Sequence, residues 1–231
     1  MWVDLHIHES TFSADSHMRL AEVVAAARAR GLDGICITDH DSMGLKDEAE
    51  RYSRETGFPI FVGVEYYSLW GDITAWGLDD FPRKRIPAQD FIDLVRARDG
   101  FCVACHPFRH NNRGLAGHLR EVRGLDGIEV FNGSTYPEDN LTASVYCREL
   151  GLIPIGASDA HWTAQVGKYA TWLPEYVDNL VDFIRILRSG ECRPAIWEPN
   201  GGYRLADLAG PGLAAWSNST ASSPPPSWPT I

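Results

Sequence analysis

Imidazole and carboxylate side chains recur at the ends of short apolar runs in this chain. They occur in residues 4–8, 38–40, 63–65, 104–106 and 158–161. Because strands of one sheet or barrel carry their last side chains to a common rim, we expect these groups to converge in space. Imidazole and carboxylate are also the ligands suited to Zn, Mn or Fe. The pattern therefore predicts a polynuclear metal site and hydrolytic chemistry.

Two pairs of these residues share the same spacing. His6 and His8 lie two positions apart in an extended run, so both side chains point to one side and can chelate one ion. Taken alone, this pair fits a half-exposed strand with two chance histidines equally well. Asp159 and His161 repeat the spacing at another strand end, and Glu65 closes the apolar run 61–64. A lone buried carboxylate costs several kcal/mol unless it is paired or metal-bound, so metal explains the whole set better.

The elements that must position these residues alternate between strand and helix patterns. We expect strands over residues 3–8, 34–39, 60–65, 73–78, 101–106, 127–131 and 153–158, and helices over 20–30, 45–56, 88–98, 114–122, 141–150 and 177–189. Such alternation favours an α/β fold with parallel strands and helices outside. A closed or nearly closed barrel is the economical arrangement, although an open doubly wound sheet fits the pattern almost as well. One domain over 1–212 is expected, followed by a Ser- and Pro-rich, disordered tail over 213–231.

The composition restricts the partners of the protein. Its formal net charge of −10 over 231 residues argues against an extended nucleic-acid surface, which needs Lys and Arg to neutralise phosphates. No apolar run approaches the length of a membrane helix, and no signal-peptide pattern opens the chain. The five cysteines are an odd number in scattered apolar contexts, as in reduced core cysteines. We therefore expect a cytoplasmic protein; the sequence does not indicate its oligomeric state.

Taken together, the motifs resemble the PHP family, the polymerase and histidinol phosphatase domain. The resemblance rests on Asp4-Leu5-His6-Ile7-His8, Ser13-Ala14-Asp15, Thr38-Asp39-His40-Asp41, Gly63-Val64-Glu65, His106-Pro107 and Ser158-Asp159-Ala160-His161, in the family's order. It implies a distorted seven-stranded (β/α)7 barrel with two or three divalent ions (Mn, Zn or Fe) at the C-terminal strand ends. By this resemblance, the first ion is held by His6, His8, Glu65 and Asp159. Glu65 bridges to a second ion on His106, and a third ion is held by Asp15, His40 and His161.

One position departs from the family pattern. Many relatives bind the second ion with a further His on the strand after Glu65, whereas residues 70–76 contain none. Depending on the alignment, Asp72 or Thr74 takes its place. Asp72 is a competent ligand and Thr74 a poor one, so the second ion is weaker or the centre is effectively dinuclear. Glu129 and Asn132, at another strand end, are candidates for orienting the ligands.

The resemblance implies a metal-dependent phosphoesterase that acts on a small phosphomonoester or nucleotide. A hydroxide held between two ions would attack phosphorus. The candidate catalytic residues are Asp159, His161, Arg109 and His110. Arg109 would add charge stabilisation and bind the substrate phosphate, and Lys168 would line the substrate cleft. His110 is either a proton donor at the rim or a solvated surface residue, the latter being favoured.

Three alternatives stay open at this point. A carboxylic ester or amide hydrolase could use the same activated water, and a 5′-end exonuclease could use the same ions. A catalytically silent PHP module that binds metal only for folding would explain the missing His.

Overall fold

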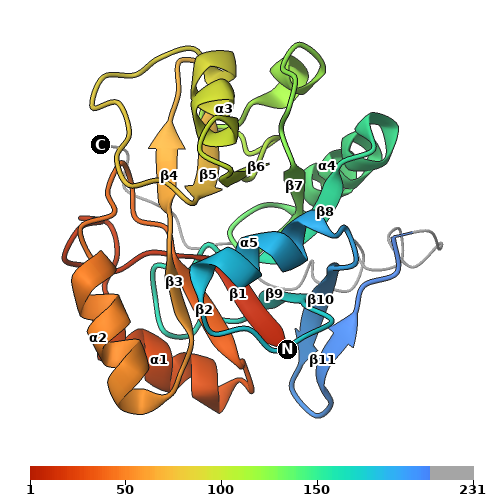
Figure 1. Cartoon of the computed structure of the whole chain (residues 1–231). Coiled ribbons are helices and arrows are strands. Elements are labelled where there is room, and N and C mark those ends of the chain that lie inside the picture. Colours follow the sequence, from red (N-terminus) through yellow and green to blue (C-terminus); the bar gives the residue numbers. More distant parts are fainter. Residues whose placement is uncertain (209–231) are drawn as a thin grey trace.

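Two sheets form the frame of the protein. A computed structural model describes residues 1–208, and the predicted tail over 213–231 lies outside the described residues. The first sheet has the strand order β11-β10-β9-β1-β2-β3 and the second the order β4-β5-β6-β7-β8 (Figure 1). The strands are β1 (Trp2–Ile7), β2 (Gly34–Ile37), β3 (Ile60–Val62), β4 (Val64–Tyr67), β5 (Asp72–Trp76), β6 (Phe101–Ala104), β7 (Gly127–Asn132), β8 (Ile153–Ala157), β9 (Tyr169–Trp172), β10 (Arg193–Glu198) and β11 (Gly202–Leu205).

Helices cover the outer side of both sheets. In Figure 1, α1 and α2 lie beside the first sheet, and α3 and α4 lie beside the second. The helices are α1 (Leu20–Ala29), α2 (Lys46–Thr56), α3 (Ala88–Arg96), α4 (Pro137–Leu150) and α5 (Leu180–Arg188), with a 3₁₀ turn η1 (Ala116–Arg120). None of the helices within residues 1–208 combines the length and apolar character that a bilayer crossing requires.

The strand pairing confirms the α/β class but not the predicted seven-stranded closed barrel. Residues 1–208 form eleven strands in two sheets, and no continuous ladder joins the sheets into a barrel. Instead, two isolated parallel bridges connect them, Ile7 with Ala160 and His40 with Glu65. The region where the sheets meet at these two bridges is here called the seam. Both bridges lie at or beside predicted metal ligands.

Local sequence explains where the elements differ from expectation. The strand predicted over 60–65 is two strands, interrupted at Gly63, where a Cβ atom would lie 2.5 Å from the carbonyl oxygen of Ala75. The helix predicted over 141–150 begins earlier, at Pro137, a residue well suited to the first helical turn. The segment predicted as a helix over 114–122 is only the 3₁₀ turn η1. Strands β9, β10 and β11 were not predicted; they pair antiparallel with one another, and β9 pairs with β1, on one side of the first sheet.

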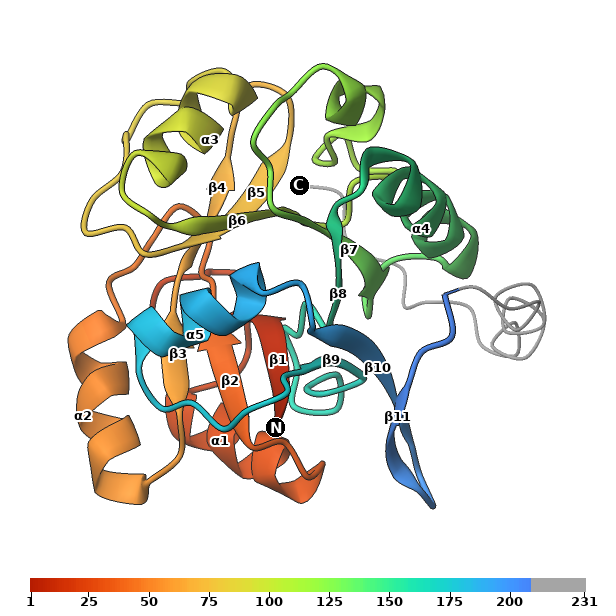
Figure 2. The same ribbon diagram turned by 45° about the vertical axis from the view of Figure 1, so that its right-hand side comes forward.

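The core beneath the sheets is shared between them. Phe183 on α5 is fully buried and stacks on Phe61 of β3 with ring centroids 4.2 Å apart. The same cluster contains Val3 of the first sheet and Ile155 of the second. Figure 2 shows α5 lying across the strands, so this helix packs against residues from both sheets.

Phe183 therefore provides a test of this packing. Phe183→Ala should lower the free energy of unfolding by about 3–5 kcal/mol, because it removes a buried ring and leaves a cavity. Val181 lies on the same helix and is 79% exposed, so Val181→Ala should change stability by less than about 0.5 kcal/mol. Urea unfolding of both variants measures the difference. Equal stability of the two would show that α5 does not anchor the core.

Candidate metal centre

The strand ends bring the predicted ligands together, as the spacing indicated. His6 and His8 come from the end of β1 and the residue after it, and His40 follows β2. Glu65 lies in β4, His106 follows β6, and Asp159 and His161 follow β8. Groups of three potential ligand atoms lie within 4.8 Å of one another in several combinations of these residues, including His6, His8 and Glu65. Ligands from both sheets thus meet at the seam.

His6, His8, Glu65 and Asp159 form the innermost cluster, here called the inner group. Nε2 of His6 lies 3.0 Å from Nε2 of His8. It lies 3.5 Å from both Oε2 of Glu65 and Oδ1 of Asp159. Nε2 of His8 lies 3.4 Å from Glu65 and 3.2 Å from Asp159. Ligands at about 2.1 Å in a tetrahedron would be separated by about 3.4 Å, so these five spacings are compatible with one ion between the two rings and the carboxylates.

Hydrogen bonds behind the two histidines fix which ring nitrogen faces the cluster. Nδ1 of His6 lies 2.8 Å from Oε1 of Glu129, and a carboxylate can only accept, so Nδ1 carries the proton. The hydroxyl of Ser13 donates its single proton to Asp39 over 2.9 Å. It must therefore accept from Nδ1 of His8, 3.1 Å away. When both rings are neutral, their Nε2 atoms present lone pairs to each other, an arrangement that a cation between them would stabilise.

Backbone conformation helps to aim two of the ligands. His106 and Asp159 have positive φ angles of 32° and 52°, which non-glycine residues rarely adopt. Each lies two residues after the end of a strand, His106 after β6 and Asp159 after β8, with its side chain among the other predicted ligands. Glu129 supports this turn, because its Oε2 accepts the backbone N–H of His106 at 3.0 Å and the side-chain amide of Asn132 at 2.8 Å. Strain of this kind is characteristic of functional sites.

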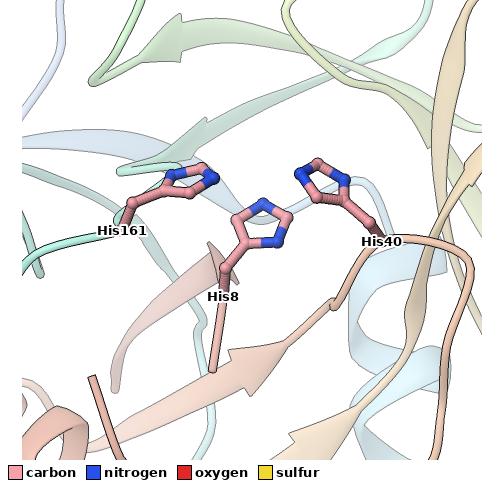
Figure 3. Close-up of side chains that lie close together, drawn as sticks. All are labelled: His8, His40 and His161. Carbon is pink, nitrogen blue, oxygen red and sulfur yellow. The ribbon is translucent and has the colours of Figure 1, made fainter. Parts of the chain in front are cut away.

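His40, His161 and Asp15 form a second cluster, here called the outer group. Oδ2 of Asp15 lies 3.1 Å from Nε2 of His40 and 3.3 Å from Nε2 of His161. Figure 3 shows the rings of His40 and His161 on either side of His8, and both centroids lie 4.3 Å from that of His8. The outer group therefore adjoins the inner one and is more accessible, since Asp15 is 54% exposed.

Around His106, the residues have a different arrangement. Nε2 of His106 lies 2.7 Å from Oε1 of Glu65, and Oδ2 of Asp72 is 3.9 Å away. Asp72 contacts Arg113 through both of its oxygens. Thr74 is buried, and its hydroxyl donates to the carbonyl oxygen of Val103 at 3.4 Å. Of the two predicted substitutes for the missing His, Asp72 is therefore the one beside His106.

The predicted substrate-binding residues fall into two classes. Arg109 lies at the centre: its Nη2 contacts Oδ2 of Asp159 and donates to Oδ1 of Asn132 at 2.8 Å. His110 is 78% exposed and lies 3.1 Å from Asp139, so it does not reach the ligand clusters. Lys168 is exposed and donates to the carbonyl oxygen of Gly133 at 2.7 Å. Arg109 is thus brought to the centre, whereas His110 and Lys168 lie at its periphery.

Burial and charge set the protonation of the inner group. Burial, followed by the charges of His161 and His40, lowers the pKa of His8 to about 3, which keeps the ring neutral. Burial alone would raise the pKa of Glu65, but the charges of His40 and His6 hold that pKa well below its ordinary value. A neutral imidazole and an ionised carboxylate are the forms that bind metal.

The residues present fit a divalent metal. Nδ1 of His106 is buried without a hydrogen-bond partner among residues 1–208, and the buried Oε2 of Glu65 and Nδ1 of His40, 2.7 Å apart, form no hydrogen bond of good geometry. Buried polar atoms are rarely left unpaired, so such orphans call for a ligand. The donor set of imidazole and carboxylate suits Zn, Mn or Fe, the metals expected from the sequence.

Arg113 is the site residue that the sequence did not reveal. It lies in the polar run Asn111-Asn112-Arg113-Gly114, which carries no periodicity and resembles any exposed loop. The one available signal was the glycine after it, which allows the loop to pack closely. Glu129 and Asn132 were expected to orient ligands, and their contacts with His6, His106 and Asp159 agree with that expectation.

Comparison with known proteins identifies relatives of this chain. A family model described as PHP-associated matches residues 137–192. An uncharacterized protein of Methanocaldococcus jannaschii is 24% identical over 154 residues, which cover 63% of this chain and 88% of the relative. A "probable phosphatase" of Caldicellulosiruptor bescii is 23% identical over 205 residues, covering 72% of this chain and 82% of that protein.

Solved structures share the fold at low sequence identity. A protein of Bifidobacterium adolescentis assigned as a metal-dependent phosphoesterase has a TM-score of 0.60 at 20% identity, covering 80% of this chain and 95% of its own. A lesion-specific endonuclease of Pyrococcus furiosus has a TM-score of 0.62 at 12% identity, covering 93% of this chain and 66% of its own. These likenesses show that the chain shares the mixed α/β fold of these proteins.

The inner group predicts a strong dependence of stability on metal. Manganese or zinc at 100 times its dissociation constant should stabilise the protein by about 2.7 kcal/mol, and chelation should remove this gain. Glu65→Gln should abolish most of the gain, because Glu65 contacts both clusters. His118→Ala is the control, since His118 is a surface residue paired with Glu121. Thermal unfolding with and without metal measures the effect, and an equal gain in both variants would contradict this account.

Glu129 provides a test of the supporting hydrogen bonds. Glu129→Gln should weaken metal binding by about 10- to 100-fold, because the amide no longer enforces the proton on Nδ1 of His6. Glu121→Gln is a matched control, since Glu121 makes the same kind of bond to His118 at 3.1 Å on the surface. Competition of each variant with a chelating dye gives the affinities. Unchanged affinity in Glu129→Gln would show that His6 needs no such orientation.

Proposed function

We propose that this chain belongs to the PHP family and is a metal-dependent phosphoesterase. Its substrate in this proposal is a small phosphomonoester or nucleotide. The observation that carries the proposal is the inner group, in which Nε2 of both His6 and His8 lie 3.2–3.5 Å from carboxylate oxygens of Glu65 and Asp159, beside the outer group and one arginine. Structural relatives named as a metal-dependent phosphoesterase and an endonuclease, and a sequence relative named "probable phosphatase", support the same reaction class.

The residues that would hold the metal are those of the inner and outer groups. Bound divalent ions would supply a water of lowered pKa and would neutralise charge on the phosphoryl oxygens. Glu129 and Ser13 hold the proton on Nδ1 of His6 and His8, so that Nε2 of each ring stays available as a ligand. Glu65 lies between the groups, with Oε2 2.7 Å from Nδ1 of His40 and 3.4 Å from Nε2 of His8. It is therefore the residue that joins the two groups.

Arg109 is the residue best placed to bind a phosphoryl group. Its guanidinium is fixed by Asp159, Asn132 and Thr135 through Nη2 and Nε. No residue within 1–208 accepts a hydrogen bond from Nη1, which leaves donors for a phosphate oxygen. A planar guanidinium held in this way favours an oxyanion over a neutral group. Arg109 would thus stabilise negative charge that develops on the substrate.

His110 has a defined partner that leaves one ring nitrogen free. Nε2 lies 3.1 Å from Oδ1 of Asp139, and a carboxylate there favours the proton on Nε2. Nδ1 then faces solvent and can exchange a proton with a leaving oxygen at the rim. Lys168, whose Nζ donates to Gly133, adds a second positive charge at the periphery. Both residues belong to the proposal as aids to substrate binding and product release.

Nucleic acid is the second candidate substrate, because one structural relative is named as an endonuclease. The net charge of −10 opposes binding to a long polyanion. An oligonucleotide end can still reach the site in the way that a mononucleotide does. A panel that contains p-nitrophenyl phosphate, nucleoside monophosphates, a 5′-phosphorylated oligonucleotide and a carboxylic ester separates these classes and the carbonyl alternative.

Arg109 and His8 provide the activity test. With Mn or Zn bound, Arg109→Ala should lower kcat/KM for a phosphomonoester by about 10²- to 10³-fold, through loss of charge stabilisation. His8→Ala should cost at least about 100-fold, since it removes a ligand. Arg120→Ala is the control, because Arg120 is an exposed residue paired with Glu149.

Steady-state assays of the three variants give these ratios. Full activity in His8→Ala, or no phosphoester turnover by the metal-loaded protein, would contradict the proposed function.

A further inference from the structure

Asp72 and Arg113 form a buried ion pair beside the metal ligands. Asp72 is fully buried, and its Oδ2 and Oδ1 accept from Nε and Nη2 of Arg113 at 2.6 and 2.9 Å. Such a parallel two-bond pair is the strongest geometry between a guanidinium and a carboxylate. Both oxygens of Asp72 are therefore already engaged by a cation that belongs to the chain.

The fold builds this contact with unusually close backbone packing. The N–H of Asp72 donates to the carbonyl oxygen of Arg113 at 2.6 Å. A Cβ atom on Gly71 would lie 2.7 Å from the backbone of Gly114, and one on Gly114 would lie 2.2 Å from the carbonyl oxygen of Pro107. The loop that carries Arg113 is thus clamped between the start of β5 and the residues after His106.

Further contacts hold the guanidinium in place. The Arg113 guanidinium lies over the ring of Tyr67, 4.4 Å from its centroid. The backbone N–H of Arg113 donates to Oδ1 of Asn111 at 3.1 Å. Arg113 is therefore fixed on the carboxylate and on an aromatic face.

The position of the pair gives it a role. Oδ2 of Asp72 lies 3.9 Å from Nε2 of His106, which in turn lies 2.7 Å from Oε1 of Glu65. An ion bound at this position would be surrounded by the side chains of Glu65, Asp72 and His106. An ion bound there through Asp72 would have to displace Arg113 or lie beside a second full positive charge in a buried place, and either is costly.

We propose that Arg113 takes the place of a metal ion at this position, so that the centre binds two ions rather than three. One ion lies in the inner group and one in the outer group, and the third positive charge is the guanidinium on Asp72. The inference rests on the proposed metal-dependent function but concerns the number of ions, which is measured without turnover. A cation that is part of the chain stays in place when a chelator removes the ions.

Metal content tests this inference. Protein loaded with Mn and freed of loose ions should contain two ions per chain by elemental analysis. Arg113→Gln should contain three, because Asp72, His106 and Glu65 then become a vacant set of ligands with uncompensated charge. Arg85→Gln is the matched control, since the Arg85 guanidinium lies 3.7 Å from the centroid of the Tyr67 ring. It should retain two ions.

A double variant covers the risk that Arg113→Gln does not fold without metal. Asp72→Asn together with Arg113→Gln removes both charges and leaves a poor ligand, so it should bind two ions. Three ions in the unmodified protein would overturn the inference while leaving the proposed function intact. Two ions in a folded Arg113→Gln, or three in the double variant, would also overturn it. If the ion numbers are as expected but the metal-loaded protein does not hydrolyse phosphoesters, the proposed function is contradicted and this inference is not.

Discussion

Four acceptor atoms that face one another in a buried place are the constraint on which this structure depends. Nε2 of His6 and of His8 lie 3.0 Å apart. Oε2 of Glu65 and Oδ1 of Asp159 lie 3.5 Å from Nε2 of His6. The bonds from Glu129 and Ser13 place one proton of each ring on the nitrogen that faces away from the cluster, so that in the neutral rings both Nε2 atoms are free to bind an ion. A cation at the centre relieves this repulsion, and the binding free energy becomes stabilisation of the fold.

This constraint explains why the site lies at the seam between the sheets. His6, His8 and His40 come from the first sheet, whereas Glu65 and the residues that follow β6 and β8 come from the second. The two isolated bridges between the sheets involve His40, Glu65 and the neighbours of His8 and Asp159. Where a continuous ladder is missing, ligands shared by bound ions would hold the sheets together. Helix α5 also joins the two sheets, because Phe183 packs in one apolar cluster with residues of both.

The sequence predicted which side chains come together better than it predicted the strands that carry them. The His and carboxylate residues at strand ends could be recognised because apolar runs, and side chains spaced two residues apart, are local features of the sequence. Strands β9 to β11 were missed because strand formation there depends on pairing, and β9 pairs with the distant strand β1. Arg113 was missed for a related reason: its role comes from two loops that approach closely at Gly71 and Gly114. Lys168 and His110 follow motifs in the sequence, yet their side chains bond to Gly133 and Asp139 outside the clusters.

Charge is distributed so that an acidic protein can bind an anion. The carboxylates of the centre are matched by Arg109 on Asp159 and by Arg113 on Asp72, and bound ions would leave the site positive.

Anomalous X-ray diffraction from manganese-loaded crystals tests the central claim most directly. The account predicts a peak within about 2.3 Å of Nε2 of both His6 and His8, with Glu65 and Asp159 completing its coordination. A protein that shows metal only on surface residues, with the inner group vacant, would contradict it.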